Sequence, residues 1–335
     1  MLTFTEFSGS PYQVGLALGR FGAQAVHTTV MPSPAWEQAM QWRDHEHVLA
    51  MQKQVKEKHP YIWDELQGLA RGLELPPDDV FAWNVRTDLP DYVDADPTMS
   101  EAFDAESATV LLAGTEGARI VHRQGGDAHL LAHCGIAQFR LDPAGEFAAF
   151  VCPGMLPGST FGVTSNGLAM AVNLVPAPQV GVGVPSIVLC RALLEAPDLS
   201  SAVKMLNQTA RAGQAHIGLG LRGGTTLLSI EFNPETVSVQ AIKPGAVHTN
   251  HLVHEDMLEQ PRVVMEPSRQ HYNEANALLQ MGDNPDPMDI LGKSAHLAAT
   301  LAWADMQINA DEVLWSVYTA PDAPVRFQMR DARHI

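Results

Sequence analysis

Ser107 lies where the pattern of the chain changes, and its hydroxyl is the first group to consider for chemistry. An acidic segment containing prolines precedes it over residues 88–106, and the strand-like run ATVLLAG follows it directly. A serine hydroxyl acts as a nucleophile when a base and hydrogen-bond donors are placed beside it. A serine between two segments can also be an ordinary turn residue, so the residue alone leaves both interpretations open.

Two groups of histidines raise the question of a metal site. They are His122, His129 and His133, and, at intervals of three, His248, His251 and His254. A zinc site needs three or four ligands that converge on one ion, and neither spacing matches a helical or zinc-finger motif. We therefore expect solvated or hydrogen-bonded histidines and no metal, and we keep a metal-dependent enzyme as a third alternative.

Motifs that bind phosphate or present a nucleophile on a sharp turn are missing from the sequence. It has no GxGxxG that opens a helix after a strand, no GxxxxGK[ST] and no GxSxG. The glycine-rich run at 218–226 has no helix pattern behind it and predicts a hairpin turn. We therefore expect no nucleotide and no other cofactor.

Composition limits the partners of the chain. Its 38 acidic and 21 basic side chains give a formal net charge of −17, which argues against nucleic acid or an anionic membrane as a partner. No apolar run approaches the length of a membrane span. The partner that remains is a small molecule, and a homo-oligomer is compatible with the sequence.

The cysteines and the first residues bear on the compartment. Cys134, Cys152 and Cys190 are odd in number and lack metal-ligand spacing, so we interpret them as free thiols in a reducing compartment. The start MLTFTEFSGS has neither a basic region nor an apolar core and does not read as a signal peptide. These observations predict a cytoplasmic protein.

The chain divides into a part with helical patterns and a part with strand patterns, and these elements must position the candidate site residues. Residues 1–106 are mainly helical: Ser10 and Pro11 open a first helix, a helical zone runs from about Trp36 to Lys58, and two further helices follow to about residue 89. From Ser107 the chain changes to short β-rich runs, with helices expected within 186–210 and 268–281 and a hairpin at the end. This order suits stacked sheets with helices outside.

Several long motifs resemble the isopenicillin-N acyltransferase-like family, which also contains β-alanyl-dopamine and carcinine hydrolases. The resemblance extends from about Ser8 to Arg326. It rests, in order, on GSPYQVGLALG, HPYIWDELQGLARGLELPPDDVFAWNVRTDL, SATVLLAG, GVTSNGLAMAVNL, VPSIVLCRALLEAPDLSSAVKML and VHTNHL. This family belongs to the N-terminal-nucleophile hydrolases.

The resemblance implies an α+β fold, a four-layer αββα sandwich made as a precursor. Residues 1–106 would be the helical N-terminal segment and 107–335 the β-rich core, together forming one domain. In such relatives a cysteine cleaves the peptide bond before it, and its freed α-amine then serves as its base. An α-amine suits that task because its unperturbed pKa is near 8. Aligned here, Ser107 takes the nucleophile's place, and autoproteolysis would cut between Glu106 and Ser107.

Other site residues follow from the same resemblance. Asn173 matches an asparagine of the oxyanion hole, and Asn250 matches a second asparagine facing the same site. An amide donor fixed at a developing oxyanion contributes about 3 to 4 kcal/mol. Turn asparagines at strand ends are the structural alternative. Asn84 and Arg86 match a segment that braces the site.

The sequence also departs from the family. Serine replaces cysteine, and Glu106 replaces the glycine before it. The acidic HNEDGD-like segment has Arg123, Gln124 and Gly125 in place of asparagine, glutamate and aspartate, and only its last acid, Asp127, is kept. These changes next to the nucleophile suggest a changed or lost active site.

Two functions therefore stand ahead of the metal-dependent alternative. The first is an amide hydrolase or acyltransferase for a small N-acyl amine or N-acyl amino acid, with Ser107 as nucleophile of an acyl-enzyme and Asn173 and Asn250 as oxyanion donors. The second is a non-catalytic or unprocessed homologue that binds a small ligand or a protein partner in the same pocket.

Overall fold

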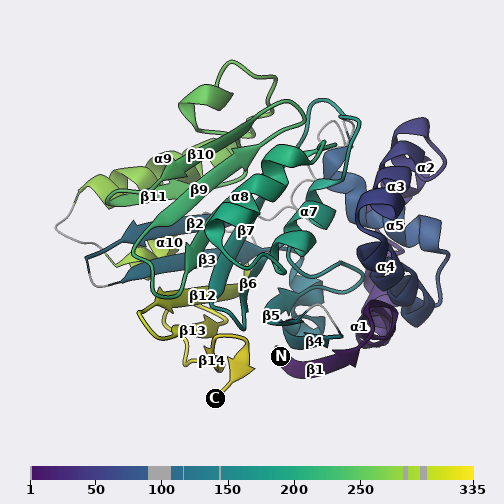
Figure 1. The fold of residues 1–335 in the computed structure, drawn as a ribbon, viewed down its shortest axis with the longest axis horizontal. Coiled ribbons are helices and arrows are strands. Elements are labelled where there is room, and N and C mark those ends of the chain that lie inside the picture. Colours follow the sequence, from purple (N-terminus) through teal and green to yellow (C-terminus); the bar gives the residue numbers. More distant parts are fainter. Residues whose placement is uncertain (1, 90–106, 116, 143–144, 282–285, 295–299) are drawn as a thin grey trace.

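The computed structural model describes residues 2–89, 107–115, 117–142, 145–281, 286–294 and 300–335. In that part of the chain two β-sheets face each other, and helices lie on their outer sides (Figure 1). The α+β class expected from the sequence is confirmed. None of the described helices is long and apolar enough to cross a membrane.

Helices make up most of the chain between residue 11 and residue 89. They are α1 (Pro11–Ala25), the π-helix η1 (Val26–Val30), α2 (Pro34–Gln41), α3 (Glu46–Lys58), α4 (Pro60–Leu73), α5 (Pro77–Val85) and the 3-10 turn η2 (Arg86–Asp88). The start of α1 is as predicted: Ser10 and Gln13 bond to each other's backbone N–H groups in a capping box. The zone expected from Trp36 to Lys58 is two helices, because His45 caps a new start.

Glycines allow α1 and α4 to cross in close contact. A Cβ atom on Gly15 would lie 2.0 Å from the carbonyl oxygen of Glu65, and one on Gly68 would lie 2.1 Å from that of Tyr12. No side chain fits at either position, so the two backbones touch directly. This crossing fixes the helical layer that carries α5, and α5 leads into the candidate site.

The first sheet has eight strands within the described residues, in the order β1-β4-β5-β6-β7-β8-β9-β10. The strands are β1 (Thr3–Gly9), β4 (Gly135–Leu141), β5 (Gly145–Val151), β6 (Phe161–Thr164), β7 (Leu168–Val175), β8 (Gln214–Leu221), β9 (Leu227–Phe232) and β10 (Val237–Ala241). β1 pairs with β4 in parallel, so the N-terminus is part of the same sheet as the later strands.

The second sheet has seven strands within the described residues, in the order β11-β2-β3-β12-β13-β14-β15. The strands are β11 (Gly245–His248), β2 (Ala108–Ala113), β3 (Ala118–Gly125), β12 (Thr300–Ile308), β13 (Val313–Tyr318), β14 (Phe327–Arg330) and β15 (Arg333–His334). The pairing of β13 with β14 confirms the hairpin expected near the C-terminus.

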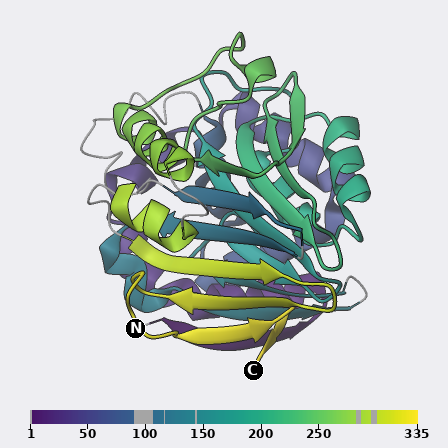
Figure 2. The same ribbon diagram turned by 90° about the vertical axis from the view of Figure 1, so that its left-hand side faces the viewer.

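The two sheets meet face to face with little space between them. A Cβ on Gly218 of β8 would lie 2.7 Å from the Leu111 side chain of β2. On the outer side of the first sheet, α8 (Leu199–Gln208) contacts β8 and β10, and α7 (Ser186–Leu193) precedes it. On the outer side of the second, α9 (Glu266–Gln280) and α10 (Pro287–Ser294) contact β11, β2 and β3 (Figure 2).

Alternation along β2 decides which side chains face the other sheet. Ala108 and Val110 pack in the apolar cluster beneath α9 and α10, so Thr109 and Leu111 point between the sheets. Thr109 is fully buried there. Thr109, two residues after Ser107, thus places a polar group in the space between the sheets.

Three strands differ from the sequence expectations. β8, with Gly218 and Gly220, and β12, with Asp305, were not predicted, because glycines and an acid weaken a strand pattern. The structure explains both: the glycines admit the facing sheet, and Asp305 pairs with Arg119 at 2.8 Å. The run expected as a strand at 130–137 is instead the 3-10 turn η4 (Ala128–His133) followed by β4. The hairpin turn expected at 218–226 is limited to residues 222–226, which join β8 and β9, because residues 218–221 belong to β8.

Candidate active site

A pocket brings together several of the residues singled out from the sequence, but Asn173 and Asn84 do not line it. Arg86, Ser107, Asp127 and Asn250 all line it, and its cavity volume is about 80 Å³. A single ordered water needs roughly 10–15 Å³, so the cavity holds several waters or a small chemical group. Its apolar walls come from Trp83, Leu130, Met155, Leu174 and Leu301.

Ser107 is held at this pocket by Gln124 of β3. The Gln124 Nε2 donates to Ser107 Oγ at 3.2 Å and to the Gly125 carbonyl oxygen at 2.9 Å. Because that carbonyl oxygen can only accept, the orientation of the Gln124 amide is fixed with nitrogen toward the serine. Gln124 therefore orients the hydroxyl but cannot take its proton.

The same amide determines that one particular nitrogen of the His122 ring carries a hydrogen. Gln124 Oε1 lies 3.2 Å from His122 Nε2, so this nitrogen carries a hydrogen. The other ring nitrogen, Nδ1, lies 2.9 Å from Thr109 Oγ1. Thr109 Oγ1 is also 2.7 Å from the Asn173 side-chain amide. A chain of hydrogen bonds thus runs from Ser107 to Asn173.

Two arrangements satisfy every contact in this chain. If His122 is neutral, Thr109 donates to His122 Nδ1, and Asn173 must turn its Nδ2 toward Thr109. If His122 carries both hydrogens, it donates to Thr109, and Thr109 donates to Asn173 Oδ1. In the second arrangement Asn173 Nδ2 has no acceptor among the described residues. The proton on His122 thereby decides whether Asn173 has a free amide donor.

Burial favours the neutral form of His122. The side chain is fully buried, and this lowers its pKa to about 4; the hydrogen bond with Gln124 acts against this, and the charge of Arg123 acts with it. His216 is the histidine on the other side of Asn173 from His122. Burial lowers the pKa of His216 as well. A negative charge beside Asn173 is the condition that favours the doubly protonated form, because opposite charges attract.

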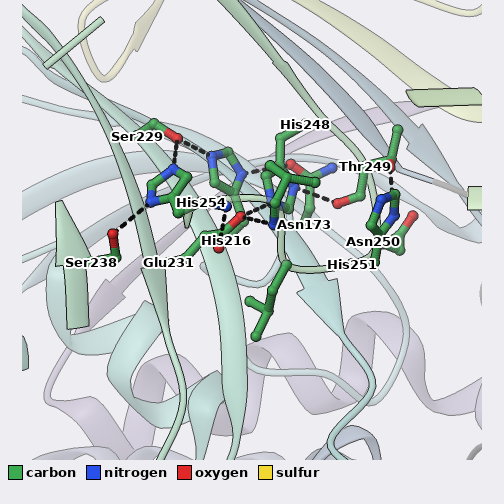
Figure 3. Close-up of polar contacts among 12 residues, drawn as sticks. Asn173, His216, Ser229, Glu231, Ser238, His248, Thr249, Asn250, His251 and His254 are labelled. Atoms are coloured by element: carbon green, nitrogen blue, oxygen red, sulfur yellow. Dashed lines mark hydrogen bonds and ion pairs between the residues drawn. The ribbon is translucent and has the colours of Figure 1, made fainter. Parts of the chain in front are cut away.

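The polar network continues from Asn173 through the space between the sheets (Figure 3). His216 Nδ1 lies 3.0 Å from Asn173 Oδ1, and His216 Nε2 lies 3.0 Å from Ser229 Oγ. Ser229 Oγ is 2.8 Å from His254 Nε2, and His254 Nδ1 is 3.0 Å from Ser238 Oγ. Burial lowers the pKa of His254. Serine hydroxyls can donate or accept, so neutral histidines satisfy this line.

An ion pair closes the network on one side. The His248 ring stacks on His216 with centroids 3.6 Å apart, and His248 Nε2 lies 2.8 Å from Glu231 Oε1. His248 Nδ1 lies 2.5 Å from the Thr249 carbonyl oxygen, so both ring nitrogens face an acceptor oxygen. Burial raises the pKa of Glu231, but the bond and charge of His248 outweigh it and leave that pKa lowered.

Asn250 presents a different atom from the one expected. Its Nδ2 donates to the Leu174 carbonyl oxygen at 2.8 Å, and its backbone N–H donates to Ser268 Oγ at 2.9 Å. The Oδ1 of Asn250 has no partner among the residues that the structure describes. At the pocket, Asn250 therefore offers an acceptor together with the second hydrogen of an amide that is already engaged.

The segment from Asn84 to Asp88 holds the pocket loop and the next helix. Asn84 Nδ2 donates to the Gly154 carbonyl oxygen at 2.9 Å, and its Oδ1 accepts from Leu156 N at 2.8 Å. Asp88, which the sequence reasoning did not single out, accepts from Ser186 N at 2.7 Å at the start of α7. Burial raises the pKa of Asp88 to about 6. The signal for Asp88 was its place two residues after Arg86, at the end of the segment NVRTD that begins with Asn84.

Arg86 forms one wall of the pocket. Its guanidinium lies 3.8 Å from the centre of the Trp83 ring, and Nη1 donates to the Trp83 carbonyl oxygen at 2.7 Å. Asp127 also lines the pocket, but its Oδ1 accepts from His129 N at 2.8 Å and caps η4. Glu106 lies outside the described residues.

The two histidine groups do not converge. His122 points between the sheets, whereas His129 is exposed on η4. In the second group, His248 bonds Glu231, His251 bonds Ser268 Oγ at 2.8 Å, and His254 bonds Ser229. Among the described residues no three histidine, cysteine or acidic side chains are grouped to hold a metal ion.

Comparison with known proteins gives one family. Residues 127–301, just over half of the chain, match the family model described as acyl-coenzyme A:6-aminopenicillanic acid acyl-transferase. The match contains Asn173 and Asn250 and begins after Ser107. Among solved structures, an Anbu (Gly-1) mutant from Hyphomicrobium sp. strain MC1 is similar with 9% identity and a TM-score of 0.25, over 67% of this chain and 87% of that chain. A search of curated proteins finds no match.

Proposed function

Because this chain belongs to the acyl-coenzyme A:6-aminopenicillanic acid acyl-transferase family, we propose that it is an amide hydrolase or acyltransferase with Ser107 as its nucleophile. Its substrate is a small N-acyl amine or N-acyl amino acid. One observation carries the proposal: Ser107 Oγ lines the pocket and accepts a hydrogen bond from Gln124. The hydroxyl therefore keeps its own hydrogen for transfer to a base.

The base in this proposal is the α-amine that cleavage between Glu106 and Ser107 would free. It takes the hydroxyl proton as Oγ attacks the substrate carbonyl, and it later returns that proton to the leaving amine. The acyl-enzyme is then resolved by water in hydrolysis or by an amine in acyl transfer. Gln124 positions Oγ throughout and exchanges no proton.

Asn173 and Asn250 have different parts in this scheme. In the form in which His122 has taken a second proton from solvent before attack, Thr109 donates to Asn173 Oδ1, and Asn173 presents Nδ2 as the donor to the developing oxyanion. Such a donor contributes about 3 to 4 kcal/mol to transition-state stabilisation. Asn250 offers Oδ1 to an N–H group of the substrate or of the freed α-amine, because its Nδ2 already bonds the Leu174 carbonyl oxygen.

The fold and the division of the chain enter the same proposal. The two facing sheets with helices outside support the four-layer αββα sandwich of N-terminal-nucleophile hydrolases. Residues 1–106 and 107–335 would then be the two chains of a processed enzyme that remain one domain.

Intact-mass spectrometry of the purified chain tests the processing step directly. We expect two masses, for residues 1–106 and 107–335, whose sum exceeds the unprocessed mass by one water. Acyl transfer is then assayed with a panel of acyl-CoA thioesters and 6-aminopenicillanic acid, and hydrolysis with N-acyl amines and N-acyl amino acids. An uncut chain whose activity is unchanged in Ser107→Ala rules the proposal out.

Gln124 also favours a second candidate, a non-catalytic homologue that binds a small ligand in the same pocket. An amide cannot replace a carboxylate that exchanges protons or carries charge. This candidate predicts that the chain stays uncut and that 6-aminopenicillanic acid raises its melting temperature without being consumed. Turnover that disappears in Ser107→Ala would exclude it.

A further inference from the structure

Two cysteines lie opposite each other at the end of the β4–β5 hairpin. Gly135 pairs with Val151 in the antiparallel ladder, so Cys134, just before β4, stands across from Cys152, just after β5. Their sulfur atoms are 3.8 Å apart, within contact distance. The third cysteine, Cys190, is buried in α7 and has no part in this pair.

Their positions meet the requirements for a disulfide. Opposed residues of an antiparallel pair have Cα atoms about 4.5 to 5.5 Å apart, and disulfides are found at Cα separations of roughly 4.4 to 6.8 Å. The sulfur atoms must move from 3.8 Å to about 2.05 Å. Rotation of the two side chains supplies this movement, so the strands can keep their register.

The two thiols differ in access to solvent. Cys134 is fully buried, whereas Cys152 is half-buried and lines the same pocket as Ser107. The Cys134 thiol donates a hydrogen bond to the Cys152 sulfur, and this bond, followed by burial, raises the pKa of Cys134. Cys134 therefore stays protonated, and Cys152 is the thiol that a small molecule in the pocket can reach.

We infer that Cys134 and Cys152 are a reversible oxidation site in the wall of the pocket, with Cys152 as the attacking thiol and Cys134 as the resolving one. The oxidant is a small peroxide that enters the pocket. The Cys152 thiolate attacks one peroxide oxygen and becomes a sulfenic acid, and the other oxygen leaves as water after protonation. The Cys134 sulfur then displaces the sulfenic hydroxyl as a second water. Two thiols and one hydrogen peroxide give one disulfide and two waters.

The bond would change the pocket without unfolding its wall. A Cβ on Gly22 of α1 would lie 3.0 Å from the Pro153 Cα atom, so the backbone beside Cys152 is pressed against a helix and has little room to move. The Cys152 side chain instead turns toward Cys134 and leaves the cavity. The disulfide itself does not depend on the proposed function, whereas any effect on turnover does.

The test uses the full chain as purified, reduced with dithiothreitol, desalted and treated with increasing hydrogen peroxide. We expect the intact mass to fall by two hydrogens, the count of iodoacetamide-reactive thiols in denatured protein to fall from three to one, and dithiothreitol to reverse both changes. Peptide mapping should find Cys134 joined to Cys152.

Variants separate this pair from other thiol chemistry. Cys190→Ser should still lose two hydrogens, whereas Cys152→Ser should not. Cys134→Ser, and Cys134→Ala if the serine variant fails to fold, should trap a sulfenic acid that dimedone labels. A wild-type chain that oxidises to sulfinic acid without a crosslink, or that joins either cysteine to Cys190, overturns the inference.

Discussion

The space between the two sheets has two ends of opposite chemistry. At one end Phe161 of β6 stacks on Phe150 with ring centroids 5.2 Å apart and meets Trp315 of β13 edge-on at 6.2 Å. At the other end β2, β7 and β8 place Thr109, Asn173 and His216 in one hydrogen-bonded network, and His248 of β11 stacks on the His216 ring.

The boundary between the two ends is narrow. The His122 ring lies with its centroid 5.7 Å from that of Phe161, so the polar network directly adjoins the aromatic packing. An apolar end is stabilised by burial and tolerates changes of similar volume. The polar end needs a partner for every atom, because a buried polar group without one costs free energy. The polar end should therefore respond far more to substitution than the aromatic end.

The largest effect is expected where the network reaches the pocket. Ser107→Ala removes the proposed nucleophile and should lower kcat/KM by more than about 10³-fold, because residual catalysis would come from binding and the oxyanion donors alone. The variant should also remain a single chain by mass spectrometry. Ser200→Ala, an exposed serine at the start of α8, is the matched control and should keep wild-type kinetics and processing.

Glu231 tests the buried charge of the polar end. Glu231→Ala removes the buried carboxylate that faces His248 Nε2 and accepts from the backbone N–H groups of Val253 and His254, and it should lower the free energy of unfolding by about 3 to 5 kcal/mol. Phe161→Leu at the aromatic end should cost only about 1 to 1.5 kcal/mol. Urea denaturation of the two variants measures both values, and equal losses would contradict the difference between the ends.

Acid should destabilise the polar end. The pKa values of His122, His216 and His254 are lowered in the folded state, so the unfolded chain binds more protons below its own histidine pKa. Stability is complete above about pH 6.5 and is lost as the pH falls toward the lowered values. The lowered pKa of Glu231 adds a loss below about pH 4.5.

The size of this acid effect follows from His122. A fall of its pKa to about 4 corresponds to roughly 3 kcal/mol, part of which is lost between pH 7.5 and pH 5. Urea denaturation at these two pH values should show the loss in the wild type and in Phe161→Leu, and a smaller loss in His122→Asn. A pH-independent stability across this range would show that the histidines are not buried in neutral form.

Thr109 gives the smallest and most specific effect. Thr109→Val keeps the shape of the side chain but removes the hydroxyl between His122 and Asn173, at an expected cost of about 1 to 2 kcal/mol. If the proton on His122 controls the Asn173 amide, this variant should lose kcat and keep KM. Thr164→Val, on β6 outside the network, is the control and should change stability but not kcat.

Much of the fold was predictable because it rests on local pattern. The helix start at Ser10 and Pro11 and the change to strands after Ser107 both follow from residues that lie close together in the chain. β8 and β12 were missed because Gly218 and Asp305 suit a strand only when a facing sheet or Arg119 is present. Those partners are distant in the chain.

For the candidate site, the sequence by itself determined which residue types were available, and the family resemblance predicted Ser107, Asn173 and Asn250 as members of one site. The tertiary structure decided what each atom can do. The Gly125 carbonyl oxygen fixes the Gln124 amide, the Leu174 carbonyl oxygen engages Asn250, and Thr109 couples Asn173 to His122. Donor and acceptor roles depend on which groups meet in space, and a sequence lists those groups without showing where they meet.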